Sequence, residues 1–416
     1  MDEPTGAAAT PGPGHPGADG RLDPLPWDLP LAPAMAALLG IVRRQLEGEG
    51  RTQADSTPAD SPADSPAHSW GLAALAARHG LEGLALRGQG GDAGAADGSA
   101  DGGFRAVAGN LERIRELHRA VGVLEAAGVA TTVMKGPALA VQAWGDVSAR
   151  SYGDVDLLVP PDRAPATVRA LLDAGYTDRR ARYGLDPSPA HWHDWGFTAP
   201  DGRTLVEIHW SLVAPGRYPA VDSAEAWRPA SREAVALPGG TVWALAPEVQ
   251  LPYLAIHATA HHWGWLEFPL TLAGLVHRNR STLDWDALRD RALRWRCRRI
   301  TTVGLLLARD LVGAQRLGLP PEVERWLTAD AAAGRLARWY GTQLLTDPDS
   351  EWYRGSPALW WRRMRLEDSA PAQLRAGWAL LFGSTTAEWE PGSGPSRVPA
   401  PLRRVLRLLR RHRGGG

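Results

Sequence analysis

Hydrophobic and polar positions repeat along the chain with two different periods, and the two periods occupy different regions. Apolar residues recur at helical spacing in residues 33–46, 70–86, 104–127, 162–175, 247–345 and 402–412. Strand-like alternation or a short apolar run marks four shorter regions: residues 130–134, 153–159, 191–198 and 204–213. Because a period near 3.6 is typical of helices and a period of two is typical of strands, the pattern predicts an α+β chain with an all-helical C-terminal part.

Segments of low sequence complexity separate these regions, and five parts are expected. Residues 1–26 are rich in Ala, Gly and Pro and are expected to be disordered. Residues 27–103 are expected to be helical, with unstructured insertions at 52–69, which contains the repeat P-A-D-S-P-A-D-S-P-A, and at 88–103. Three further parts complete the order: a core over residues 104–240, a helical domain over 241–350 and a C-terminal extension over 351–416.

The C-terminal extension ends in an arginine-rich segment, residues 402–412, in which Leu402, Val405, Leu406 and Leu409 recur at helical spacing. This pattern predicts a helix that docks on the rest of the protein through its apolar face and exposes a basic face to solvent. Binding of that basic face to acidic lipid or nucleic acid is the alternative interpretation.

The composition narrows the class of protein. Hydrophobic residues make up 44% of the 416 residues, which is enough for a substantial core, and the formal net charge of zero gives no reason to expect nucleic acid or an acidic membrane as a partner. The single cysteine, Cys297, excludes an intramolecular disulfide and is predicted to be a small buried helical residue. No secretion signal and no apolar run of membrane-spanning length is recognisable, so a cytoplasmic protein is expected.

The strongest chemical signal lies in the strand pattern of residues 153–159, G-D-V-D-L-L-V. Alternation places Val155, Leu157 and Val159 on one face of this strand and places Asp154 and Asp156 together on the other. Two neighbouring carboxylates on a rigid strand repel each other unless a cation lies between them. Oxygen ligands of this kind suit Mg²⁺ or Mn²⁺, so the pair predicts a site for a divalent metal.

A second signal precedes the first. The short strand that ends at Met134 is followed directly by Lys135, Gly136 and Pro137, and then by a helical pattern. Gly136 can adopt backbone conformations that other residues avoid, and proline fits the first position of a helix, where no amide donor is needed. The free amides at the N-terminus of this helix form an anion site. A strand, a glycine turn, a helix and a carboxylate pair together indicate a place to hold a metal-bound triphosphate.

Lys135 is the only lysine in the chain, because every other residue among the 46 counted as Lys or Arg is arginine. The arginine excess fits a GC-rich coding sequence, and a lone lysine under that bias is predicted to be required rather than incidental. A compact ammonium can approach a phosphate as a point charge, which a planar guanidinium replaces poorly.

Three motifs in this order resemble those of the uncharacterised nucleotidyltransferase family in the DNA polymerase β superfamily. They are K-G-P-x-L-A at 135–140, R-S-x-G-D-V-D-L-L-V at 150–159 and V-E-I-H-W at 206–210. The resemblance extends to residues 70–79, which are similar to the helical N-terminal part of the family, and to residues 248–292, which are similar to its helical C-terminal part. It implies a nucleotidyltransferase core with a small mixed β-sheet, flanked by helices.

The resemblance also implies the roles of individual residues. Asp154, Asp156 and Glu207 would be the catalytic carboxylates and the ligands of two divalent metals, which in such sites lie about 3.5–4 Å apart. His209 shares the strand face of Glu207 and is expected either to contact the substrate or orient that carboxylate, or else to be a hydrogen-bonded structural histidine. The nucleotide-binding residues implied by the motifs are Lys135, Gly136, Arg150, Ser151 and Gly153.

The implied reaction moves a nucleoside monophosphate from an NTP to an acceptor and releases pyrophosphate. The acceptor is a small molecule, a peptide, a protein or RNA, and nothing in the sequence chooses among them. Two other functions stay open: a catalytically silent protein of the same fold that binds a nucleotide or a partner, and a metal-dependent phosphotransferase that moves the terminal phosphate.

Two groups of histidines suggest other metal sites but fit them less well. His191 and His193 alternate along a predicted strand without a third ligand at useful spacing. His257, His261 and His262 lie one turn apart on a predicted helix, and we expect them to be core or substrate-facing residues because the glutamate that usually accompanies a zinc-binding helix is missing. Trp263 and Trp265, beside these histidines, are expected in the core, with stacking on a base as the alternative.

Overall fold

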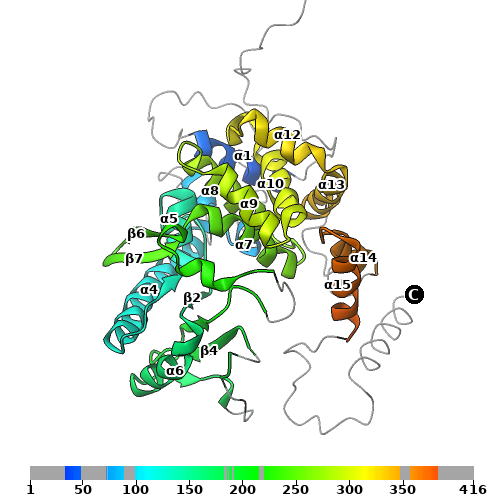
Figure 1. The fold of residues 1–416 in the computed structure, drawn as a ribbon. Helices are drawn as coiled ribbons and strands as arrows, with labels where there is room; N and C mark the ends of the chain where they lie inside the picture. The colour runs from blue at the N-terminus through cyan, green and yellow to red at the C-terminus, as the bar shows by residue number, and fades with distance from the viewer. Residues whose placement is uncertain are drawn as a thin grey trace, which may run out of the picture.

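A computed structural model describes residues 33–47, 72, 74–88, 99–181, 185, 187–189, 192–214, 220–346 and 357–382. Within these residues the predicted α+β architecture is confirmed, with one mixed seven-stranded sheet and helices before and after it (Figure 1). The expected disordered N-terminus, the insertion at 52–69 and the basic helix at 402–412 lie outside the described residues.

The sheet places the two strands that carry the predicted carboxylates side by side. Its strand order is β3 (Thr177–Asp178), β4 (Asp194–Thr198), β5 (Leu205–His209), β2 (Asp154–Leu158), β1 (Thr132–Val133), β7 (Gly240–Leu245) and β6 (Arg232–Leu237). Strand β2 pairs in parallel with β5 and antiparallel with β1, and β1 pairs in parallel with β7. The predicted hairpin of β4 and β5 is confirmed.

The helices form two groups. Those in the first half of the chain are α1 (Pro33–Glu47), α3 (Glu82–Gly88), α4 (Ser99–Ala126), α5 (Gly136–Trp144) and α6 (Ala164–Asp173). Those in the second half are α7 (Pro247–Ala260), α8 (Glu267–Asn279), α9 (Trp285–Arg294), α10 (Arg298–Val312), α11 (Ala314–Leu317), α12 (Pro321–Ala329), α13 (Ala331–Thr346), α14 (Pro357–Arg365) and α15 (Ala370–Phe382). Figure 1 shows the second group gathered beside the strands, with α4 and α6 on the side away from it.

Alternation along β2 separates two environments, as the sequence predicts. Val155 and Leu157 belong to a buried cluster that the sheet shares with α4 and α6. Leu158, which points the other way, belongs to the larger buried cluster of the helical part. Because side chains two apart share a face of a strand, Asp154 and Asp156 lie on the face toward the helices. The carboxylate pair is therefore placed between the sheet and the helical part.

The hairpin of β6 and β7 is a feature that the sequence pattern did not predict. No strand was expected between residues 214 and 246, yet β6 and β7 pair antiparallel and β7 reaches Leu245, past residue 240 where the core was expected to end. Only one side of the hairpin is buried, so its apolar pattern is short, and its clearest signal is the turn at Gly239, which has φ +94°. Helix α4 also begins earlier than expected, at Ser99, within the insertion expected at 88–103.

The loop from residue 145 to residue 153, which leads into β2, is held by the helices α3 and α4. The amide of Leu84 in α3 donates to the carbonyl oxygen of Ala149 at 3.1 Å. The side chain of Asn110 in α4 is buried and donates to the carbonyl oxygen of Arg150 at 2.8 Å. Backbone groups of the loop are thus satisfied by residues far away in the sequence, which fixes the position from which β2 starts.

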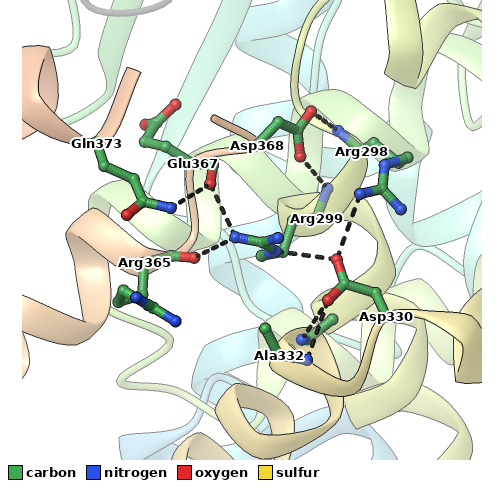
Figure 2. A network of polar contacts seen from close by, with 9 residues as sticks. Arg298, Arg299, Asp330, Ala332, Arg365, Glu367, Asp368 and Gln373 are labelled. Atoms are coloured by element: carbon green, nitrogen blue, oxygen red, sulfur yellow. Dashed lines mark hydrogen bonds and ion pairs between the residues drawn. The ribbon is translucent and has the colours of Figure 1, made fainter. Parts of the chain in front are cut away.

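The C-terminal helices α14 and α15 are joined to the helical part by a polar network around the start of α10 (Figure 2). Asp368 accepts hydrogen bonds from the backbone amides of Arg298 at 2.9 Å and Arg299 at 2.7 Å. The guanidinium of Arg299 donates to the carbonyl oxygens of Arg365 and Glu367, at 3.1 and 3.0 Å. Since the residue before α10 supplies no side-chain cap, Asp368 caps this helix from a distant part of the chain.

Cys297 is fully buried, as predicted, but it lies directly before α10 and not within a helix, so the prediction that it is helical is wrong. Among the helices of the described residues, none has both the length and the apolar character that crossing a membrane requires.

The cap on α10 gives a first prediction. Replacing Asp368 by alanine removes two charge-assisted hydrogen bonds at a helix N-terminus and is expected to lower the free energy of unfolding by about 1–2 kcal/mol. Asp368→Asn keeps an acceptor but loses the charge. Its free energy of unfolding should lie between those of the wild type and the alanine variant. Urea unfolding measures these differences. An alanine variant as stable as the wild type would show that solvent satisfies the start of α10 equally well.

His79, in the turn before α3, ties the N-terminal part to the start of α8. Its side chain is 1% exposed, and its Nδ1 accepts a hydrogen bond from the amide of Leu266 at 3.1 Å. The proton of the neutral ring therefore lies on Nε2, which has no hydrogen-bond partner among the described residues. Burial, with a smaller contribution from the charge of Arg78, lowers the pKa of His79 to about 4.

The lowered pKa predicts a loss of stability in mild acid. Below pH 6.5 the unfolded chain binds a proton at His79 that the folded chain does not bind until the pH falls to about 4, so stability decreases as the pH falls through this window. Between pH 7 and pH 5 this single group should cost about 2 kcal/mol. His79→Asn retains an acceptor for the amide of Leu266 and should remove that part of the pH dependence in urea unfolding. Equal losses in both proteins would mean that His79 protonates in the fold without penalty.

Candidate metal and nucleotide site

The pairing of β2 with β5 builds the centre of the site. In this register Asp156 lies opposite Glu207 and Leu158 lies opposite His209. Because residues opposite and two apart share one face of the sheet, Asp154, Asp156, Glu207 and His209 all point toward the helical part. The structure thus brings together the three carboxylates and the histidine that the sequence singled out.

Asp156 is the most enclosed of these carboxylates, with 1% of its side chain exposed. Its Oδ1 is 2.9 Å from Nε2 of His209, and its Oδ2 is 3.2 Å from Nζ of Lys135. Burial would raise the pKa of Asp156, but the positive charge of Lys135 and the hydrogen bond with His209 outweigh burial and hold this pKa well below its usual range. Asp156 is therefore a permanent negative charge in the middle of β2, beside the end of β1.

The two other carboxylates experience the opposite effect. Burial, followed by repulsion from Asp156, raises the pKa of Asp154 and also that of Glu207. Asp154 has no ion-pair partner in the described part of the chain, and Glu207 has only His209, whose Nε2 is 3.8 Å from its Oε2. The cluster therefore carries more negative charge than its own cations balance, which is the condition that favours a bound cation.

The donor set fits a divalent metal. Asp156, Glu207 and His209 each offer a ligand atom, and these atoms lie within 4.8 Å of one another. Asp154 is not in this closest group, although it lies on the same strand face two residues before Asp156. Buried Oδ2 of Asp156 accepts no hydrogen bond from the described residues, so it retains a free lone pair beside Lys135. The residues therefore fit a cation held mainly by carboxylate oxygens.

The turn after β1 has the conformation that the sequence predicts. Gly136 has φ +63°, a left-handed conformation, and Pro137 follows it in the first turn of α5. The buried side chain of Gln250 in α7 donates to the carbonyl oxygen of Met134 at 2.6 Å, which fixes the strand end just before Lys135. The free amides at the start of α5 and the ammonium of Lys135 consequently lie beside the carboxylates.

Arg150, Ser151 and Gly153, which the sequence predicts at the nucleotide, have different surroundings in the structure. Arg150 is buried and forms an ion pair with Glu267 in the first turn of α8, while its Nε and Nη1 have no hydrogen-bond partner among the described residues. Ser151 donates to a carboxylate oxygen of Glu82 at 2.8 Å. The Cα of Gly153 faces open space, with no atom close to where a Cβ would lie. Arg150 and Ser151 therefore connect the loop before β2 to other helices.

The sequence did not single out two residues that border the site. Tyr253 in α7 is buried, and burial raises its pKa although the nearby charge of Lys135 opposes this. Glu267 balances the charge of Arg150 and is held by it. Neither residue has a local motif that distinguishes it from an ordinary helical residue, because its role arises from contacts with residues more than 100 positions away.

The other histidine groups do not form a metal site among the residues whose placement is described. The one group of three or more possible ligands found there is Asp156, Glu207 and His209. His257 and His261 contact each other through their rings, with centroids 4.7 Å apart. His191 lies outside the described residues, so the suggested pairing of His191 with His193 stays a prediction.

Comparisons with known proteins give one match. Residues 70–313 match the model of a family described as "Uncharacterised nucleotidyltransferase". No curated protein and no solved structure matches the chain. The matched region runs from the residues before α3 to the end of α10, and it therefore includes the sheet, the carboxylates and the helices α7 and α8 that face them.

The ion pair between Lys135 and Asp156 gives a prediction for the metal-free protein. Lys135→Met should destabilise the fold by about 3 kcal/mol, because it leaves a buried carboxylate with only His209 to balance it. Asp156→Asn should also destabilise, because it leaves the ammonium without its charged partner. The double variant contains neither lone charge. Its loss of free energy of unfolding should therefore be smaller, by about 1–3 kcal/mol, than the sum of the losses of the two single variants.

Urea unfolding of all four proteins in the presence of a chelator measures this coupling. The partly exposed pair of Arg309 and Glu324, whose Nη1 and Oε2 are 3.0 Å apart, serves as a matched control, and its coupling should stay below about 1 kcal/mol. Additive losses for Lys135 and Asp156 would mean that the two charges are independent in the folded protein.

Proposed function

The chain belongs to this uncharacterised nucleotidyltransferase family, and we propose that it moves a nucleoside monophosphate from an NTP to an acceptor, releasing pyrophosphate. The observation that carries the proposal is the buried Asp156, which lies opposite Glu207 in the sheet and directly beside the glycine turn of Gly136. This arrangement supports an acidic metal site beside an anion site, as transfer from a metal-bound triphosphate requires.

Asp154, Asp156 and Glu207 are proposed as the metal ligands, with Mg²⁺ or Mn²⁺ as the ion. Carboxylate oxygens are the ligands that these ions prefer, and the excess negative charge of the cluster supports their binding. A bound divalent ion supplies charge neutralisation for the phosphates and for the leaving pyrophosphate. His209 contacts Asp156 at 2.9 Å and, in this proposal, holds that carboxylate in one orientation.

Lys135, Gly136, Arg150, Ser151 and Gly153 are proposed to hold the nucleotide. Lys135 and the amides of α5 would bind phosphate oxygens. Gly153 has no side chain, so its backbone could approach those oxygens closely. Arg150 has two buried nitrogen atoms without partners among the described residues, which supports contact with an anion, although its remaining nitrogen is held by Glu267. These residues position the triphosphate and balance its charge, and no covalent intermediate is needed.

One observation favours the alternative of a catalytically silent binding protein. Lys135 already balances Asp156 within the protein, with 3.2 Å between Nζ and Oδ2, so one of the three carboxylates has a cation without any metal. In the proposed enzyme, Lys135 exchanges this contact for a phosphate oxygen when the nucleotide binds. In the silent protein, the ion pair persists and stabilises the fold.

Labelled nucleotides distinguish these functions. The purified protein is incubated with Mg²⁺, a cell extract that supplies acceptors, and an NTP labelled on either the α- or the γ-phosphate. We expect transfer of the α-label only. Glu207→Gln removes a proposed metal ligand and should slow this transfer at least about 100-fold. The matched control Glu112→Gln changes an exposed carboxylate on α4 and should transfer at the wild-type rate.

Each other outcome has a definite meaning. Transfer of the γ-label would identify a phosphotransferase instead. Metal-dependent protection of the fold by NTP without transfer of either label would identify the silent binding protein. Equal transfer by the wild type and Glu207→Gln would contradict the assignment of Glu207 as a metal ligand.

A further inference from the structure

A row of aromatic rings runs from the carboxylate site toward the surface along the end of α7 and the start of α8. Adjacent ring centroids in this row are 6.1 Å apart for Tyr253 and His257, 4.7 Å for His257 and His261, and 5.5 Å for His261 and Trp265. The ring of Phe268 closes the row from the side, 5.8 Å from both histidine rings and 5.5 Å from Trp265. We call these five residues the ring row.

One end of the ring row meets the proposed metal and phosphate site. Tyr253 is 3% exposed. The charges of Lys135 and Asp156 lie close enough to influence the pKa of both Tyr253 and His257. Burial, together with the charge of Lys135, lowers the pKa of His257, so its ring is neutral and can stack like an uncharged aromatic. At the other end, His261 is exposed, and the row is therefore accessible from solvent.

The turn that carries the outer rings is held in a strained conformation. His262 and Trp263 have φ values of +58° and +56°, in the left-handed region that residues other than glycine rarely occupy. Trp263 is fully buried, and its Nε1 donates to Oγ1 of Thr259 at 3.2 Å. A Cβ at Gly304 of α10 would lie 2.8 Å from the ring of Trp263, so the absence of a side chain at Gly304 makes room for this ring.

This anchoring bears on function because strain in a backbone persists only where the surrounding structure enforces it. With Trp263 locked in the core, the residues on either side of the turn, His261 and Trp265, are held outside the core with their ring planes tilted by 60° to each other. The amide of Leu266 is fixed in addition by its hydrogen bond to His79. The outer rings therefore form a pre-positioned surface rather than a mobile one.

We propose that the ring row is the subsite for the nucleobase of the NTP, which stacks on Trp265 beside His261 while its phosphates lie at Lys135 and Gly136. This inference rests on the proposed function. It is supported by the continuity of the row with the phosphate site and by the mixture of aromatic and imidazole rings, which suits a planar heterocycle better than an aliphatic group. Stacking of this kind tolerates different bases, because every base has an aromatic face.

The test separates the base from the phosphates. Affinity is measured by calorimetry in Mg²⁺ for ATP, GTP, CTP and UTP, and for inorganic tripolyphosphate, which carries the phosphates alone. Trp265→Ala should weaken the binding of the preferred NTP roughly ten-fold or more while leaving tripolyphosphate unchanged. Trp265→Phe retains an aromatic ring and should recover most of the lost affinity. Trp243→Ala removes a tryptophan on β7 that is 54% exposed and outside the ring row, and it should bind as the wild type does.

The other outcomes overturn the inference in distinguishable ways. Unchanged NTP affinity in Trp265→Ala would mean that the base lies elsewhere and would leave the row to an aromatic group of the acceptor. Equal losses for NTP and tripolyphosphate would mean that the variant disturbs the phosphate site and that no base is bound at the row. If the wild type bound neither, the proposed function and this subsite would fail together. NTP binding without label transfer would contradict the proposed transfer reaction but not the nucleobase subsite.

Discussion

A carboxylate that is almost completely buried and still charged is the constraint on which the rest of the site depends. Removing an ion from water costs several kcal/mol, and Asp156 offsets this through Lys135 on one oxygen and His209 on the other. Lys135 follows β1 and His209 ends β5, so both partners reach Asp156 only because β2 lies between these two strands. The strand order is thus also the arrangement that keeps this charge tolerable.

The N-terminal helices serve this arrangement from outside the sheet. The loop before β2 packs so closely on α3 that a Cβ at Gly83 would lie 1.5 Å from the carbonyl oxygen of Ser148. The buried side chain of Asn110 and the ion pair of Arg150 with Glu267 join the same loop to α4 and α8. The family match begins at residue 70 and so includes these supports. The site is therefore a product of both halves of the chain.

The parts that could be predicted from the sequence are those that local patterns determine. The alternation around Asp154 and Asp156, the left-handed turn at Gly136 and the hairpin of β4 and β5 each depend on a few neighbouring residues. The hairpin of β6 and β7 escaped prediction because only one of its sides is buried. The contact of Arg150 with Glu267, the cap of α10 by Asp368 and the role of Tyr253 could not be predicted, because long-range contacts leave no period in the sequence.

The charge balance of the site connects its structure to its chemistry. Asp154 and Glu207 have raised pKa values because of burial and of Asp156, while Arg150 is already balanced by Glu267. Lys135 can neutralise one carboxylate, so the remaining charge calls for a further cation in the same place. On the proposed function, Asp154, Asp156 and Glu207 would hold the metal, and the ammonium of Lys135 would then be available to the phosphates of the nucleotide. A single compact lysine in a chain of arginines suits that exchange, because a point charge can change partners without the paired geometry that a guanidinium favours.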